Sequence, residues 1–321
     1  MKDEFVNLHL HSDYSTQDSV IKIPDLLNVV KEYGQQAVAI TDHGSVEAWT
    51  NFYLLSQNTD IKPIFGCEFY CKDSYIKPSN RDRYHLIALA KNDNGIKTIN
   101  KLQFESTRHF YYKNLLPYPF LFENTDDIFI STACSLGTIG QSFDIEKKNK
   151  NNNDAEIFLN KLLDVFGKDN VALEFQFHPT WKSDKTPNYY PQNFINEKLL
   201  DLWDNMDLKY CIVTTDAHFI TDSSIRDKLL ADAWNKSAEE TDGTTLKSNC
   251  VGNSELVKSF AEESNFSDLK LVDDMIHNTS VIADMCNVNN VNNIGGDRVL
   301  PRFNKHRKFK KIFFTQPKKV I

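Results

Sequence analysis

The chain has 321 residues, of which 40% are hydrophobic and 25% charged, values typical of a soluble globular protein. It contains no apolar run of 18 or more residues and no signal-peptide pattern at its start, so we expect a cytoplasmic protein without a membrane-spanning segment. The net charge of −7 is uneven: nine Lys or Arg and no acidic residue lie from Arg298 onward, which leaves −16 on residues 1–297. An acidic body is unusual for a duplex-DNA binder unless bound cations invert the local potential.

The first predicted strand, residues 5–11, carries a pair of histidines. Side chains alternate along a strand, so His9 and His11 should share one side, and Val6, Leu8 and Leu10 the other. Two imidazoles at the end of a strand suit a divalent metal ion. By itself, the pair is equally compatible with an ordinary partly buried surface pair.

Strands and helices alternate along the next 200 or so residues. This pattern implies a parallel sheet, and polar residues at the ends of many strands favour a closed barrel with the site at its mouth. An open, doubly wound sheet is the competing fold. Helix 94–110 should bury Ile96, Ile99, Leu102 and Phe104. Further strands are expected at 37–40, 62–70, 84–90, 127–134, 171–178 and 210–218, and helices at about 23–33, 46–56, 94–110, 155–166 and 192–203.

After His218 the pattern becomes purely helical, with helices expected at about 224–237, 255–263 and 267–285. We therefore predict three regions: a barrel domain over 1–222, a helical appendage over 223–290 and a basic tail over 291–321.

Residues of metal-ligand type recur near the predicted strand ends. Any one of them has an ordinary structural explanation, but nine such coincidences favour a metal site. Nine ligands exceed the needs of one zinc ion, so two or three divalent ions (Zn, Mn or Fe) are expected. Asp42 should orient a ligating imidazole from behind, and His178 is a candidate for substrate binding. The nine predicted ligands are His9, His11, Asp18, His43, Glu68, His85, Cys134, Asp216 and His218.

Clustered ions suit hydrolysis of a phosphate ester, because one ion can activate water while others neutralise the phosphate and the leaving oxygen. No P-loop or GxGxxG motif is present, so nucleotide binding of those kinds is not supported. The six cysteines form no CxxC pair and are expected to be free thiols or metal ligands.

The predicted ligands lie within six short motifs: His9-x-His11 with Asp18, Thr41-Asp42-His43-Gly44, Gly66-Cys67-Glu68, Tyr84-His85-Leu86, Thr132-Ala133-Cys134-Ser135-Leu136-Gly137 and Asp216-Ala217-His218. These motifs together resemble the PHP (polymerase and histidinol phosphatase) family, most closely the version found in bacterial replicative DNA polymerase III alpha subunits. The resemblance implies a distorted, seven-stranded, TIM-like β/α barrel with a helical appendage, three metal ions bound by the nine residues named above, and 3′–5′ exonuclease activity on DNA.

Two positions depart from the usual family pattern. Ser19 follows Asp18 where glycine is usual, and Thr132-Ala133-Cys134 stands where a Ser-Gly-Cys turn is common. The resemblance ends before the polymerase region, so we expect this chain alone not to polymerise DNA.

Three functions follow as hypotheses. The first is a 3′–5′ exonuclease acting on single-stranded or primer-end DNA, in a bacterial cell or a virus-infected bacterial cell. The second is a small-molecule phosphatase of the histidinol-phosphatase type. The third is a non-catalytic subunit that docks on a separately encoded DNA polymerase through the appendage and the tail.

Overall fold

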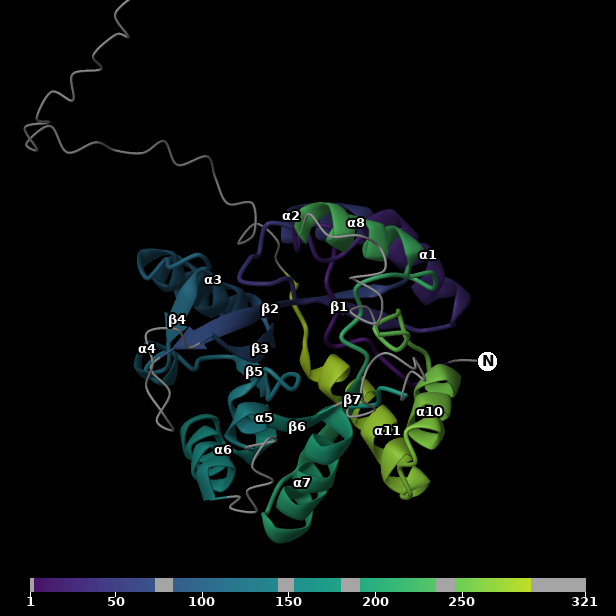
Figure 1. Cartoon of the computed structure of the whole chain (residues 1–321). Helices are drawn as coiled ribbons and strands as arrows, with labels where there is room; N and C mark the ends of the chain where they lie inside the picture. Colours follow the sequence, from purple (N-terminus) through teal and green to yellow (C-terminus); the bar gives the residue numbers. More distant parts are fainter. Residues whose placement is uncertain (1–2, 73–82, 144–152, 180–190, 235–245, 290–321) are drawn as a thin grey trace, which may run out of the picture.

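The computed structural model describes residues 3–72, 83–143, 153–179, 191–234 and 246–289. Within these ranges a curved, seven-stranded sheet is surrounded by helices, as the sequence predicted for a distorted β/α barrel (Figure 1). The strand order is β1-β2-β3-β5-β6-β7, with β4 beside β2. The strands are β1 (Ala37–Ile40), β2 (Lys62–Lys72), β3 (Tyr84–Ala90), β4 (Leu115–Pro117), β5 (Ile128–Ser131), β6 (Val171–Gln176) and β7 (Tyr210–Thr214).

The segment 5–11 joins the two edges of this sheet, although it is not the regular strand that we predicted. It forms a single bridge, between Leu10 and Ala217. The predicted alternation is wrong, because Val6 and Leu8 pack inside the barrel whereas Leu10 belongs to the outer core. Four backbone hydrogen bonds connect the segment to both edges: Ala39 N–H to Asn7 O (2.9 Å), Thr41 N–H to Leu10 O (2.8 Å), His11 N–H to Ala217 O (2.9 Å) and Ala217 N–H to His9 O (3.3 Å).

The sheet is mixed, which corrects the prediction of a parallel sheet. Strand β3 runs antiparallel to both β2 and β5. Strands β2 and β3 are consecutive in the chain and pair directly, and such a pair needs no crossover helix. Because Tyr70 near the end of β2 pairs with His85 near the start of β3, His85 lies on the same rim as the ends of the parallel strands.

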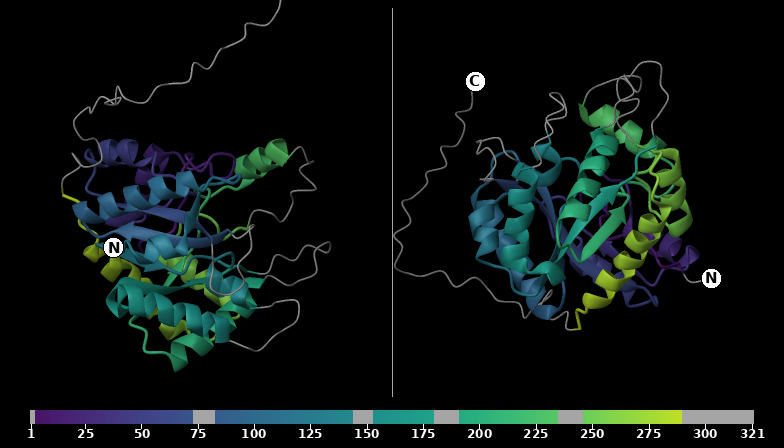
Figure 2. Two further views of the ribbon diagram at one scale, coloured as in Figure 1. Left: turned by 90° about the vertical axis from the view of Figure 1, so that its left-hand side faces the viewer. Right: turned by 90° about the horizontal axis from the view of Figure 1, so that it is seen from below.

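Most of the helices appear where the sequence predicted them, and they cover the outside of the sheet (Figure 2). The N-terminal α1 has proline in its first turn, and Gly34, at φ 74°, follows its end. Phe104 is 67% exposed, which corrects its predicted place in the core. The helices are α1 (Ile23–Glu32), α2 (Trp49–Ser56), α3 (Asp93–Arg108), α6 (Asn153–Phe166), α7 (Pro191–Asn205), α8 (Ser224–Trp234), α10 (Ser254–Glu263), α11 (Leu269–Met285), the unpredicted short α4 (Tyr118–Phe122) and α5 (Thr138–Ser142), and a 3₁₀ turn η1 (Lys168–Asn170).

The last described helix, α11, closes the end of the barrel where β1, β2 and β7 begin. Ile282, Ala283 and Cys286 pack into the interior core together with residues from the strands. The backbone oxygen of Ala283 accepts a hydrogen bond from Lys62 Nζ (2.7 Å) at the start of β2. The helical appendage thus completes the barrel core, and the mouth at the opposite end stays open. No described helix combines the length and apolar character needed to cross a membrane.

The predicted region boundaries stay predictions. The basic tail, the end of the helix predicted at 224–237 and most of the loop before α6 lie outside the described residues.

Shortening the side chain of Ile282, through which α11 closes the barrel, should destabilise the fold. We expect Ile282→Ala to lower the free energy of unfolding by about 2–4 kcal/mol, because Ile282 is fully buried in the barrel interior. Asp274→Ala, at an exposed position of the same helix, should change it by less than about 0.5 kcal/mol. Urea unfolding measures both, and equal effects of the two variants would contradict the closing role of α11.

Candidate metal centre

The carboxylate of Glu68 lies at the centre of the predicted site. It projects from β2 and is completely buried. Its Oε1 is 2.7 Å from His85 Nδ1 and 3.4 Å from His9 Nε2. Its Oε2 is 3.5 Å from His11 Nε2 and contacts His43 Nδ1. Four imidazoles from three separate parts of the barrel rim therefore converge on one carboxylate.

Asp216, just after β7, supplies a second carboxylate on the same side. Its Oδ1 lies 3.0 Å from His9 Nε2 and 3.1 Å from His11 Nε2, and 3.7 Å from His218 Nδ1. Its backbone has φ 47°, a left-handed conformation that aspartate adopts more readily than most residues. Because of this turn in the backbone, Asp216 and His218, which are two positions apart, both direct their side chains into the cluster.

Asp18 and Cys134 complete the cluster at its two edges. Asp18 Oδ2 lies 2.9 Å from His43 Nε2 and 3.5 Å from His218 Nε2. Cys134 Sγ lies 3.5 Å from His85 Nδ1. The structure thus brings all nine predicted ligands together. Three subsets have ligand atoms within 4.8 Å of one another: His11, His43 and His218; His9, His11 and Glu68; and Glu68, His85 and Cys134.

Several buried atoms of this cluster have no hydrogen-bond partner among the described residues. Burying a polar atom without a partner costs free energy, and a bound cation would supply the missing interaction. Imidazole, carboxylate and thiolate donors suit zinc, manganese or iron, so the residues fit divalent ions. The atoms are His9 Nε2, His11 Nε2, His43 Nδ1, both carboxylate oxygens of Glu68, and Asp216 Oδ1.

The electrostatics of the cluster also favour cations. Burial alone would raise the pKa of Glu68, but the imidazoles of His85, His43 and His9 outweigh it and hold the pKa well below its ordinary value. Burial likewise opposes ionisation of Asp216, and His9 and His218 hold its pKa well below the ordinary value. Both carboxylates are therefore charged at neutral pH.

Hydrogen bonds behind three imidazoles fix which nitrogen faces the cluster. His9 Nδ1 donates to Glu174 Oε1 (2.7 Å), and His218 Nδ1 donates to the backbone oxygen of Asp216 (2.7 Å). His11 Nδ1 lies 3.2 Å from Ser15 Oγ, whose hydroxyl donates to Asp42. With a metal ion bound, each imidazole would keep its proton on Nδ1 and present an unprotonated Nε2 to the ion.

Asp42 supports the site through neighbouring serines and not by direct contact with an imidazole. It accepts hydrogen bonds from Ser15 Oγ (2.7 Å) and from both the backbone N–H and the hydroxyl of Ser12 (2.7 Å each). Burial raises its pKa to about 6, while these hydrogen bonds act in the opposite direction. Asp42 therefore orders the loop after His11.

The prediction missed Glu174 and Arg226. Glu174 accepts hydrogen bonds from Ser131, Gln176 and Thr214 beneath His9. The signal for Glu174 in the sequence was an acidic residue on the polar face of a predicted strand, which the structure shows to be β6. The buried Arg226 of α8 donates from Nη2 to Asp18 Oδ1 (2.6 Å) and from Nε to its backbone oxygen (2.8 Å). No local pattern pointed to Arg226, because it is 208 residues from Asp18.

His178 lies in a different environment from the nine ligands. Its Nδ1 is hydrogen-bonded to Ser248 Oγ, and its Nε2 lies 3.2 Å from Gln176 Oε1. Burial lowers the pKa of His178 to about 4, so it is neutral at physiological pH. Its assignment to substrate binding stays a prediction.

Strained backbone conformations occur at or beside three of the predicted ligands. Gln17 precedes Asp18 and has φ 65°, and Ala133 precedes Cys134 and has φ 61°. Ala133 occupies the position where the related turn commonly has glycine, which adopts this conformation without strain. Together with Asp216, Gln17 and Ala133 make three of the six described non-glycine residues that have positive φ.

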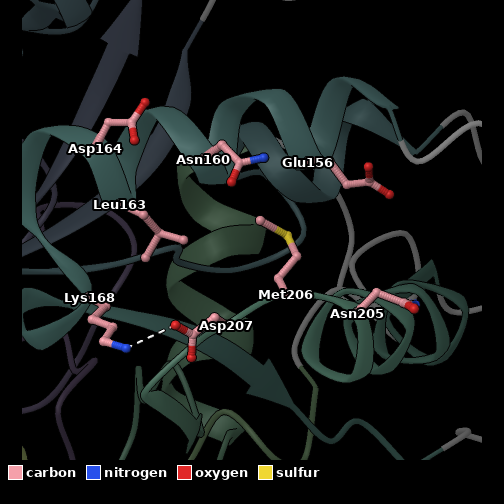
Figure 3. A pocket seen from close by; sticks show the side chains of 8 residues that line it. All are labelled: Glu156, Asn160, Leu163, Asp164, Lys168, Asn205, Met206 and Asp207. Atoms are coloured by element: carbon pink, nitrogen blue, oxygen red, sulfur yellow. Dashed lines mark hydrogen bonds and ion pairs between the residues drawn. The ribbon is translucent and has the colours of Figure 1, made fainter.

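A cleft of about 490 Å³ opens beside the cluster. Asp18 and His43 form one part of its wall, and Gln103, Lys113 and Asn114 contribute to the rest. A second cleft, of about 560 Å³, lies on the outside of the barrel along α6 and after α7, where Lys168 pairs with Asp207 (Figure 3). Its lining contains none of the predicted site residues, whereas the first cleft reaches Asp18 and His43 of the cluster.

Comparison with known proteins agrees with the geometry. The family model described as "PHP domain" matches residues 7–178. DNA polymerase III subunit alpha of Aquifex aeolicus is 33% identical over 231 residues, covering 68% of this chain and 19% of that protein. The protein of the same name from Borreliella burgdorferi is 29% identical, covering 89% of this chain and 24% of its own length. The chain therefore spans about a fifth to a quarter of these relatives.

A solved structure from Bifidobacterium adolescentis, described provisionally as a metal-dependent phosphoesterase, covers 80% of this chain and 96% of its own. Its identity of 12% and TM-score of 0.29 carry no information on function.

Divalent metal should stabilise the folded protein. Zinc or manganese at 100 times its Kd should raise the free energy of unfolding by about 2.7 kcal/mol, because the folded cluster binds the ion and the unfolded chain does not. Glu68→Gln should lose most of this gain, whereas Glu156→Gln in the outer cleft should keep it. Thermal unfolding with and without metal measures the gain, and an equal metal-induced shift for Glu68→Gln and the native protein would disprove the site.

The support from Glu174 should also be measurable. Glu174→Gln keeps the shape but removes the charge that holds the His9 Nδ1 proton, so we expect metal affinity to fall about 10- to 100-fold. Metal titration of the purified variant tests this, with Glu156→Gln again as the control. Native affinity in Glu174→Gln would show that His9 needs no such support.

Proposed function

The chain belongs to the PHP domain family, and we propose that it is a metal-dependent phosphoesterase that acts on DNA as a 3′–5′ exonuclease. The observation that carries this proposal is the cluster of buried imidazole and carboxylate atoms that have no hydrogen-bond partner in the described part of the chain, next to an open cleft. Matches to proteins named DNA polymerase III subunit alpha support DNA as the substrate.

The nine clustered residues would hold two or three divalent ions. Such ions would supply positive charge for the phosphate and acidify a water molecule for attack on phosphorus. His9, His11 and His218 each present Nε2 because their Nδ1 atoms are engaged. Glu68, facing four imidazoles, would help to hold the ions with both of its carboxylate oxygens.

The residues on the cleft side would orient the phosphodiester. Asp18 and His43 face the cleft and join it to the cluster. The guanidinium of Arg226 fixes Asp18, so this carboxylate keeps its direction when the cleft is filled. Lys113, on the same cleft, provides a positive charge for a phosphate oxygen.

Degradation of labelled single strands tests the proposal. With manganese or zinc, the native protein should shorten a 5′-labelled strand progressively from its 3′ end. Asp216→Asn should lower the rate by at least about 100-fold, since even supporting residues behind metal ligands are worth 10–100-fold. Asparagine also tolerates the left-handed backbone at this position, so the substitution adds little strain.

Other outcomes would assign a different function. Release of inorganic phosphate from monoesters, with the strand left intact, would identify a small-molecule phosphatase. If the native protein and Asp216→Asn shorten the strand equally fast, the nuclease activity comes from a contaminant and not from the proposed metal centre. Metal binding without hydrolysis of either substrate would indicate that the protein is a non-catalytic, structural subunit.

A further inference from the structure

Three consecutive aromatic side chains are exposed between α3 and β4. Phe110, Tyr111 and Tyr112 are 67%, 50% and 75% exposed, respectively. Large aromatic side chains usually gain stability by burial, so an exposed group of three suggests a binding surface. We call these residues, together with Arg83 and Lys113, the aromatic platform.

The platform is held in a defined shape. Tyr111 N–H donates to Lys113 O (2.9 Å), and the rings of Tyr111 and Tyr112 meet edge to face with their centroids 4.9 Å apart. Arg83 Nη2 donates to Tyr111 O (3.4 Å), and its guanidinium carbon lies 5.8 Å from the centroid of the Tyr112 ring. Tyr112 has φ 60°, a conformation that a bulky residue rarely adopts. These contacts order the rings before any ligand binds.

The platform is continuous with the metal-centre cleft. Lys113 and its neighbour Asn114 line that cleft together with His43. Lys113 Nζ lies 5.4 Å from the centroid of the Tyr70 ring, and this ring stacks on His43 with 5.5 Å between centroids. A chain passing over the platform would therefore enter the cleft beside a proposed metal ligand.

The local charge favours an anionic ligand, in contrast to the acidic body. Arg83 and Lys113 are both part of the platform. Glu105, an acidic residue in the adjoining last turns of α3, is paired with Arg108 (3.0 Å) and His109 (3.1 Å). Aromatic rings for base stacking, combined with positive charge for phosphates, are the features that bind single-stranded nucleic acid.

We propose that the aromatic platform binds the unpaired bases of a single nucleic-acid strand and leads its backbone into the metal-centre cleft. This inference rests on the proposed function, because it names what part of the substrate is recognised next to the cleaved bond. Stacking explains why the rings are exposed and ordered, and the adjacent cations explain how the strand approaches an acidic protein.

The test compares a normal strand with a strand of equal length made of abasic sites. Asp216→Asn protein is used for binding, so that the strand is not cut, and affinity is measured by fluorescence anisotropy. Adding Tyr112→Ala should weaken binding of the normal strand about 5- to 100-fold, the equivalent of one lost stacking contact. The same change should leave binding of the abasic strand unaltered, because that strand has no base to stack.

Two control variants separate stacking from damage to the fold. Tyr112→Phe keeps the ring and should bind both strands as the parent does. Ile157→Ala removes an exposed apolar side chain on α6 and should also have no effect. Equal affinities of Tyr112→Ala and its parent for the normal strand would overturn the proposal and favour a protein-docking role for the platform. An equal loss for both strands would also overturn it, because the loss would then not depend on bases.

Hydrolysis separates failure of the platform from failure of the proposed function. In the otherwise native protein, Tyr112→Ala should raise KM for the normal strand and leave the rate on the abasic strand unchanged. If the native protein hydrolyses neither strand, the nuclease proposal fails, while the binding comparison still decides the role of the platform.

Discussion

The buried carboxylate of Glu68 imposes the main constraint on this structure. Four imidazoles surround it, and neither of its oxygens has a hydrogen-bond partner among the described residues. A charged group with so few partners is stable in a protein interior only if positive charge compensates it. The barrel rim supplies the geometry for this compensation, because strands from distant parts of the sequence bring the imidazoles to one point.

The two ends of the barrel differ in structure and in role. At one end, α11 packs its apolar residues into the interior and receives a hydrogen bond from Lys62, which closes the core. At the other, irregular backbone replaces regular strands: the end of segment 5–11 makes one bridge, from Leu10 to Ala217, and Asp216 adopts a left-handed conformation. The apolar end provides stability, and the irregular end places polar side chains where regular alternation would not.

Charge connects the site to its surroundings. The protein is acidic, yet bound cations would reverse the potential at the cluster, and Lys113 and Arg83 make the nearby surface locally basic. Arg226 holds Asp18 and Glu174 holds His9, each through a hydrogen bond on the side of the ligand that faces away from the cluster. The site therefore consists of the nine clustered residues and of a supporting set that holds each of them in one orientation.

The sequence by itself determined the barrel class, most of the helices and the nine residues that cluster. Their types and their recurrence near strand ends are local signals, and a position near a strand end indicates which rim the side chain reaches. Only the tertiary structure decided the direction of β3, the closure by α11 and the roles of Glu174 and Arg226. These features depend on contacts between distant segments, such as Arg226 with Asp18 across 208 positions, and local periodicity contains no information about such contacts.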